Sequence, residues 1–213
     1  MNEVPFTTVF TLALQGEPTH VVGVADEPVA LPVSEWTQPA DEHDHRLVDL
    51  CVGPTLDVGC GPGRLTAELA ERGHVVLGID VVREAVGQTR ERGGAAIVRD
   101  VFDELPGEGR WETALLADGN VGIGGDPLAL LRRLTEVVDP LGRVVVEVAG
   151  PGVAASTHWA SLQAGDQRSR PFRWSVVSVD SIGETAAEAG LAVSCVERIG
   201  ERWAVVLQGS PQP

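Results

Sequence analysis

LDVGCGPGR, residues 56–64, stands where an apolar, strand-like segment changes into a helical pattern. Glycine at positions 59, 61 and 63 lets the backbone turn tightly and lets a ligand approach it closely. A glycine-rich turn from a strand into a helix is typical of sites that bind a nucleotide-type cofactor. The stretch therefore predicts an α/β fold with a cofactor site where this strand ends.

Strand-like and helical segments alternate along the chain from this turn onward. We expect strands at TLDV, VVLGI, AAIV, TALLA and RVVVEV, and helices that begin near Gly63, Val82 and Pro127. The last of these helices has the clearest signal, because Asp126 can cap it and Pro127 suits its first position. Such alternation predicts βαβ units and a parallel sheet.

The N-terminal segment has a different pattern. Residues 1–40 contain the alternating stretches TTVFTLAL and HVVGVA, from which we predict an N-terminal β extension of two or three short strands. A helix capped by Asp41 is predicted at 41–51. We expect residues 41–213 to form one domain, because they contain no internal repeat and no low-complexity linker.

The segment after Val148 predicts antiparallel elements. Two strands are expected around a polar turn at Gly165 and Asp166, followed by a helix at about 180–189. The stretches LAVSCVERI and RWAVVLQ predict a final antiparallel hairpin that turns at residues 200–201.

The composition limits the functions that the chain can have. Its 213 residues include 31 acidic and 16 basic side chains, which give a net charge of −15, and they include no lysine and no tyrosine. The acidic excess argues against nucleic acid and membrane surfaces as partners. The absence of lysine excludes a Schiff-base lysine and the lysine of a phosphate-binding P-loop. The N-terminus has no pattern typical of a secretion signal, which predicts a cytoplasmic protein.

The glycine spacing distinguishes two classes of cofactor. The dinucleotide fingerprint G-x-G-x-x-G would need glycine where this chain has Arg64. The stretch instead reads D-x-G-x-G-x-G from Asp57 to Gly63, and in this it resembles the motif of the class I S-adenosylmethionine-dependent methyltransferases. Two more acids end the next two predicted strands, Asp80 and Asp100. The resemblance covers roughly residues 41–149.

The resemblance implies a Rossmann-like methyltransferase fold, with a mostly parallel seven-stranded sheet and helices on both faces. It implies S-adenosylmethionine as the cofactor and S-adenosylhomocysteine as the product. Asp57 would lie near the methionyl part, Asp80 would hold the ribose hydroxyls, and Asp100 would bind the adenine amino group. The cofactor-binding residues expected from it are Asp57, Gly59, Cys60, Gly61, Gly63, Asp80, Val81, Asp100, Val101 and Ala117.

In this family the loop after the fourth strand, here residues 117–125, lies beside the reactive methyl group. Its four glycines suit close approach to a ligand, and Asp118 and Asn120 can orient a substrate, although the loop can also be a plain flexible connection. His158 lies in a region where family members build the substrate wall. Asp118, Asn120 and His158 are therefore the candidate catalytic residues. The chain lacks the motifs of enzymes that methylate nucleic acid bases, which favours a small-molecule methyl acceptor.

Two further groups of residues have an open interpretation. His43 and His45 can belong to a lid over the cofactor, or they can lie exposed on a polar helix face. Their spacing is a weak metal-binding signal, and we expect no metal site. The segment RSRPFRW at 168–174 can bind a carboxylate or phosphate through its arginines while its aromatic rings hold an apolar body, or it can be a charged turn before an edge strand.

These features predict a methyltransferase that acts on a small-molecule acceptor by direct in-line methyl transfer, as a monomer or homodimer. Two alternatives remain. An NAD(P)-dependent Rossmann oxidoreductase would share the fold and Asp80, but tyrosine and lysine, the common catalytic pair of short-chain enzymes, are absent. A non-catalytic protein that binds S-adenosylmethionine as a regulatory ligand would share every cofactor residue.

Overall fold

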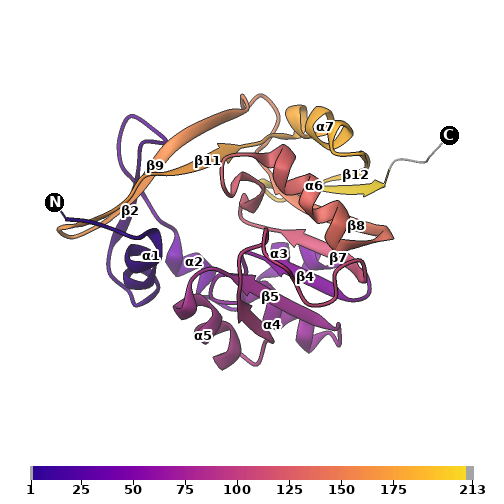
Figure 1. Cartoon of the computed structure of the whole chain (residues 1–213), viewed down its shortest axis with the longest axis horizontal. Helices are drawn as coiled ribbons and strands as arrows, with labels where there is room; N and C mark the ends of the chain where they lie inside the picture. Colours follow the sequence, from indigo (N-terminus) through magenta and orange to yellow (C-terminus); the bar gives the residue numbers. More distant parts are fainter. Residues whose placement is uncertain (1, 210–213) are drawn as a thin grey trace.

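Seven strands form the central sheet of the computed structural model, which describes residues 2–209 (Figure 1). In sheet order they are β12 (Leu191–Ile199), β13 (Arg202–Gly209), β8 (Val138–Val148), β7 (Trp111–Leu116), β4 (Thr55–Val58), β5 (Val76–Asp80) and β6 (Ala96–Val98). The strands from β8 to β6 are parallel, and β13 runs antiparallel to both of its neighbours. The predicted mostly parallel seven-stranded sheet and its final hairpin are confirmed.

Helices cover both faces of this sheet. They are α3 (Glu42–Val48), α4 (Arg64–Glu71), α5 (Arg83–Glu91), α6 (Pro127–Val137) and α7 (Val179–Glu188). Successive side chains of β7 pack in different cores: Leu116 packs with α6 and α7, whereas Leu115 packs with α3 and α4. Both faces are therefore buried, which explains why the central strands are continuously apolar. No helix in the described part of the chain is long and apolar enough to cross a membrane.

A second sheet joins segments from distant parts of the chain. Its strand order is β1 (Asn2–Val4), β10 (Gln167–Ser169), β9 (Ser156–Ala164), β2 (Thr19–Val22) and β3 (Val29–Ala30), and β11 (Phe172–Val176) pairs with β9. Figure 1 shows the indigo N-terminal segment and the orange strands lying together on one side of the central sheet. The sequence predicted these strands as two separate groups. The segment between Val148 and α7 forms three strands and not the two predicted, because Pro171 separates β10 from β11.

The prediction of a strand at TTVFTLAL is wrong, since Phe6–Leu14 form helix α1. Phe6, Val9, Phe10 and Ala13 recur at helical spacing and bury one side of the helix against β9 and α5. The stretch fits both a period of two and a period of 3.6, and the apolar partners decide between them. A short helix, α2 (Val33–Trp36), follows before α3.

The helix ends follow the predicted caps. The Asp41 carboxylate accepts a hydrogen bond from the backbone N–H of Asp44, and the Asp44 carboxylate accepts one from Asp41, which forms a capping box at the start of α3. Asp126 caps α6 through one hydrogen bond, which its carboxylate accepts from the N–H of Ala129, and Pro127 is the first helical residue. These caps fix the first turns of the helices that lead into and away from the functional site.

Candidate functional site

The glycine turn connects β4 to α4 and is open at its middle glycine, Gly61. Gly59, Gly61 and Gly63 all have positive φ angles, of 73°, 54° and 85°. A side chain at Gly63 would lie 2.6 Å from Thr89, so only glycine fits there. A Cβ at Gly61 would meet no atom within 4 Å. The backbone at Gly61 is therefore accessible to a ligand, as the sequence predicted for this loop.

Asp80 ends β5 and connects it to the glycine turn. One carboxylate oxygen accepts a hydrogen bond from the N–H of Gly61 at 3.0 Å, and the other accepts one from the N–H of Val82 at 2.8 Å. Burial raises the pKa of Asp80, and these hydrogen bonds partly offset the rise. Each oxygen has a second lone pair with which it can accept a ligand hydroxyl.

Asp57 is a buried carboxyl group inside β4. It is 2% exposed, and its Oδ2 accepts a hydrogen bond from the Thr66 hydroxyl at 2.6 Å. Burial raises the pKa of Asp57 to about 6, and the bond from Thr66 opposes this rise. A cation placed near Asp57 would favour its charged form.

The ends of β5 and β6 carry the residues predicted for the adenine side. Asp100 is exposed, and its Oδ1 accepts a hydrogen bond from the N–H of Phe102 at 3.0 Å. Val101 instead packs in the core and is 4% exposed. The exposed apolar side chains here are Val81, Val98 and Phe102, which are 45%, 40% and 50% exposed. Phe102 was not among the residues predicted from the sequence, although its position two residues after a strand-end acid was a usable signal.

The loop after β7 is bound to the glycine turn through Asn120. The Asn120 side-chain amide donates hydrogen bonds to the carbonyl oxygens of Val58 at 3.0 Å and Gly59 at 2.9 Å. The Asn120 amide group therefore holds the two loops together, and its hydrogens are not available to orient a substrate. Ala117, just before this loop, is buried.

Asp118 is held in the same loop by an arginine. Its two carboxylate oxygens accept hydrogen bonds from Nη2 of Arg64 at 3.0 and 2.9 Å. Burial raises the pKa of Asp118, while the charge of Arg64 lowers it. The structure thus places Asp118 and Asn120 beside the glycine turn, where both side chains fix the backbone of the loop.

His158 and Trp174 lie opposite each other on β9 and β11 and so share one face of the sheet. Atoms of the Trp174 ring lie 3.1 Å and 4.0 Å from the positions that a Cβ would take on Gly122 and Gly119. The His158 Nε2 is 2.8 Å from the hydroxyl of Ser156. Trp174 therefore forms a wall against the loop after β7, and His158 lies beside it.

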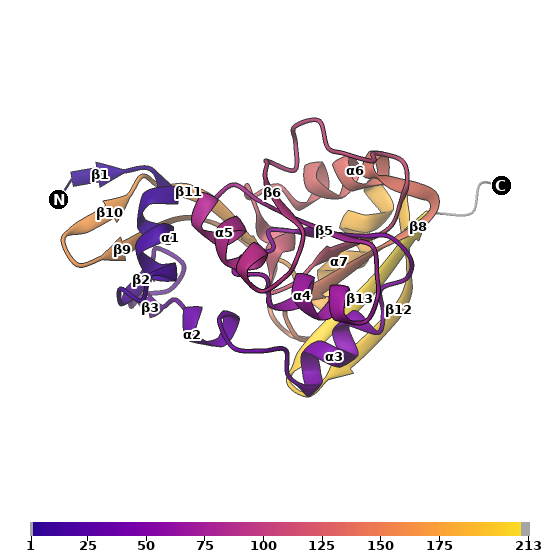
Figure 2. The same ribbon diagram turned by 90° about the horizontal axis from the view of Figure 1, so that it is seen from below.

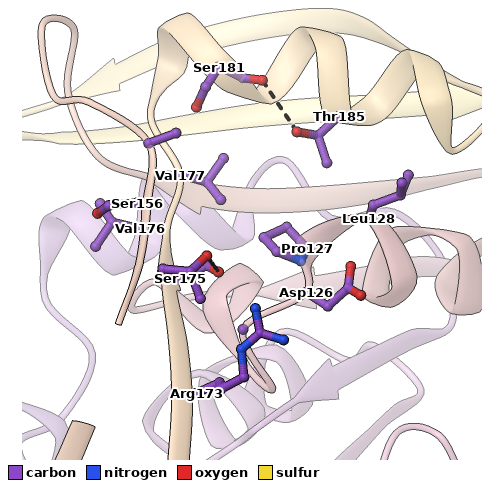
Figure 3. A pocket seen from close by; sticks show the side chains of 13 residues that line it. Asp126, Pro127, Leu128, Ser156, Arg173, Ser175, Val176, Val177, Ser181 and Thr185 are labelled. Atoms are coloured by element: carbon purple, nitrogen blue, oxygen red, sulfur yellow. Dashed lines mark hydrogen bonds between the residues drawn. The ribbon is translucent and has the colours of Figure 1, made fainter. Parts of the chain in front are cut away.

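The arginines of the segment 168–174 do not share this wall. Arg173 alternates with Trp174 along β11 and lines a cavity of about 560 Å³ on the other side (Figure 3). The start of α6, the start of β9, most of β11 and the first turns of α7 line this cavity, as does Asp126. Arg170 is exposed, and Phe172 packs edge-on against Phe6. The interpretation in which an arginine and an aromatic ring contact the same ligand is therefore wrong for Arg173 and Trp174, because neighbouring strand residues point to opposite faces of the sheet.

The remaining candidate residues lie in polar or buried settings. His43 is close to Gly200 at the turn of the C-terminal hairpin, and His45 Nε2 lies 3.5 Å from a Glu68 carboxylate oxygen. Cys60 is buried with its Sγ 3.7 Å from the Thr89 hydroxyl, and burial raises the pKa of its thiol. Cys60 therefore fills the turn as a neutral thiol.

The comparisons with known proteins agree with this geometry. A model of the methyltransferase domain family matches residues 35–196. A trans-aconitate 2-methyltransferase from Paracidovorax citrulli is 31% identical over 118 residues, which are 54% of this chain and 45% of that protein. The match therefore spans less than half the length of that curated relative.

Two solved structures share the fold. A SAM-dependent methyltransferase from Bacteroides fragilis, in complex with S-adenosyl-L-homocysteine, has a TM-score of 0.81 at 19% identity, covering 97% of this chain and 94% of its own. The 1,6-didemethyltoxoflavin-N1-methyltransferase from Burkholderia thailandensis has a TM-score of 0.61 at 20% identity, covering 83% of this chain and 81% of its own. At these identities the likeness concerns the fold.

Proposed function

The chain belongs to the methyltransferase domain family, and we propose that it transfers a methyl group from S-adenosylmethionine to a small organic acceptor. The observation that carries this proposal is the contact between three strand ends. Asp80 accepts a hydrogen bond from Gly61, and Asn120 donates one to Gly59, so the acid, the glycine turn and the loop after β7 meet at one edge of the sheet. Ligands of open α/β sheets bind at the carboxyl edge of the strands.

The residues at this edge fit the cofactor. The open backbone at Gly61 admits a ligand, and the free lone pairs of Asp80 suit the ribose hydroxyls. Asp100 would accept from the adenine amino group, with Val81 and Phe102 as apolar neighbours of the ring. Buried Asp57 would favour the methionyl ammonium group nearby. When bound, S-adenosylmethionine supplies a methyl group on a positively charged sulfur.

The protein's own task is to orient the acceptor and exclude water. Orientation alone can lower such a barrier by on the order of 7–11 kcal/mol. Asn120 and Asp118 contribute by fixing the loop after β7, and Trp174 provides a flat apolar wall against that loop. His158 would accept a proton from an acceptor that arrives protonated, and Ser156 would hold its ring in place.

The N-terminal segment would be an addition to the methyltransferase domain that packs near the proposed acceptor side. We propose that residues 1–40 are an addition to a methyltransferase domain at 41–213, which the start of the family match at residue 35 supports. The addition pairs with β9, which contains His158, and with β10. The strongly acidic chain would act in the cytoplasm, as a monomer or homodimer, without nucleic acid or membrane partners.

An acceptor assay tests the proposal. The purified protein is incubated with S-adenosylmethionine and a panel of carboxylic acids, phenols, amines and nitrogen heterocycles, and S-adenosylhomocysteine is measured by mass spectrometry. We expect it to form together with an equal amount of a methylated acceptor. If the protein binds the cofactor but no compound in the panel raises the rate of S-adenosylhomocysteine formation above the acceptor-free rate, the regulatory alternative would be supported.

Trp174 is expected to matter for the acceptor and not for the cofactor. The Trp174→Leu variant should lower turnover about tenfold, which corresponds to about 1.4 kcal/mol of lost contact. Binding of S-adenosylhomocysteine should stay within about twofold of wild type, because the cofactor contacts are made by other strands. The matched control is Arg170→Gln, an exposed residue outside the wall. Equal loss of turnover and cofactor binding in the Trp174 variant would contradict this role.

A further inference from the structure

Five charged side chains from five parts of the chain form one hydrogen-bonded network. They are Asp44 in α3, Arg64 at the start of α4, Asp118 after β7, Glu147 in β8 and Arg202 at the start of β13. Figure 2 shows α3 beside the C-terminal hairpin, where the network begins. No sequence motif indicates these contacts, and the proposed chemistry uses only Asp118.

Asp44 is the central acceptor of the network. Its Oδ1 accepts a hydrogen bond from Nη1 of Arg202 at 2.6 Å and forms an ion pair with Nη1 of Arg64. Its Oδ2 accepts the N–H of Asp41 at 3.1 Å as part of the helix cap. The Asp44 side chain is 2% exposed. The position of this carboxylate is therefore set by the cap of α3 and by two arginines at once.

Asp118 is held by the network at both its side chain and its backbone. Arg64 donates to its carboxylate, and its own N–H donates to Glu147 Oε2 at 2.9 Å. Arg202 in turn fixes Glu147 through bonds of 2.8 and 2.7 Å from Nε and Nη2. Asp118 is the only non-glycine residue with positive φ in the part of the chain that the structure describes. Such a conformation persists where the surroundings over-determine it.

The network is better explained by geometry than by stability. Buried ion pairs often contribute little net stability, because removing charges from water offsets their attraction. Arg64 also leaves its buried Nε without a hydrogen-bond partner among the described residues, which is unfavourable. The network instead fixes the position of Asp118, which has a strained backbone conformation.

We infer that Asp44 and Arg202 are positioning residues, which hold Asp118 through Arg64 and Glu147 and thereby set the loop 117–125 beside the glycine turn. The functional part of this inference rests on the proposed methyl transfer, whereas the positioning itself does not. Helix α3 and the C-terminal hairpin, neither of which contains a cofactor motif, would then determine the shape of the acceptor side.

Hydrogen exchange of the full-length chain, followed by mass spectrometry, tests this inference. The Asp44→Asn and Arg202→Gln variants should each exchange about fivefold faster or more in a peptide covering 117–125, because local opening becomes easier. A peptide covering 130–137 in α6 should exchange as in wild type. The control is Glu201→Gln, which removes a charge next to Arg202 from a side chain that is 94% exposed, and should change neither peptide.

Further variants separate positioning from folding. The double variant Asp44→Asn/Arg202→Gln removes one charge of each sign. Its hydrogen exchange at 117–125 is measured in place of a single variant that does not fold. Asp44→Glu keeps the charge and should restore part of the slow exchange. Unchanged exchange at 117–125, or an equal increase along the whole chain, would overturn the inference. Cofactor binding by the wild-type protein tests the proposed function separately, and with a known acceptor the variants should lower kcat more than they raise KM for the cofactor.

Discussion

Replacing Asp80 with alanine is expected to weaken binding of S-adenosylhomocysteine about 100-fold or more, because hydrogen bonds to a charged group contribute roughly 1.5–3 kcal/mol each. The variant would lose the bonds that we propose to the ribose hydroxyls. It would also lose the acceptors that hold the N–H groups of Gly61 and Val82. Isothermal titration calorimetry of the wild-type and variant proteins measures this change.

The matched control for this prediction is Asp103→Ala. Asp103 is an exposed carboxylate that follows β6, so its removal changes the net charge equally without touching the glycine turn. Both variants should unfold cooperatively, as judged by thermal melting. An affinity within about threefold of wild type in a folded Asp80→Ala protein would show that Asp80 does not bind the cofactor.

Replacing Asp57 with asparagine is expected to stabilise the ligand-free protein above about pH 6. Burial raises the pKa of Asp57 to about 6 from its usual 3.8. Stability from this group is fully present below pH 3.8 and is lost as the pH rises through about 6, because the folded state must then bury a charge. Two pKa units correspond to about 3 kcal/mol, which the variant should regain. Chemical denaturation from about pH 4 to pH 8 measures the difference.

The same variant should change the pH dependence of cofactor binding. A nearby ammonium group lowers the pKa of a carboxyl, so binding to the wild-type protein should release a proton. The affinity for S-adenosylhomocysteine should therefore rise from about pH 5 to pH 7 in the wild-type protein. Asp57→Asn should bind S-adenosylhomocysteine more weakly, and its affinity should depend less on pH. The pH dependence that remains would come from Asp80 and Asp118, because burial also raises their pKa values. Parallel profiles in the two proteins would contradict the proposed place of Asp57.

The sequence was sufficient for the central sheet, because each of its strands is an apolar run next to a turn or a helix cap. It was not sufficient for the second sheet. There β1 pairs with β10, so that Glu3 lies opposite Arg168, and no local pattern specifies such a distant partner. The helix α1 was missed because its apolar residues fit two periods, and only its contacts with β9 and α5 distinguish them.

The candidate site was predictable where a spacing fixes a contact. Asp80 lies nineteen residues after Gly61, and the structure joins them by a hydrogen bond. The roles of side chains were harder to predict. The Asn120 amide faces the glycine turn, and Asp44 meets Arg202 across 158 residues of sequence. The opposite directions of Arg173 and Trp174, in contrast, follow from strand alternation once β11 is recognised.

The nicotinamide alternative places different demands on the same turn. A dinucleotide site needs a third glycine for close packing of the helix on the strand, and Arg64 occupies that position. The Arg64 guanidinium is hydrogen-bonded to Asp44 and Asp118 and is 9% exposed. Because both carboxylates engage this guanidinium, it is not free to bind a pyrophosphate at the start of α4.

The measurement that tests the central claim most directly is calorimetric titration of the wild-type protein with S-adenosylhomocysteine and, separately, with NADH. We expect S-adenosylhomocysteine to bind at one site per chain and NADH to produce no binding heat. Binding of NADH, with none of S-adenosylhomocysteine, would contradict the assignment of the glycine turn and its strand-end acids to S-adenosylmethionine.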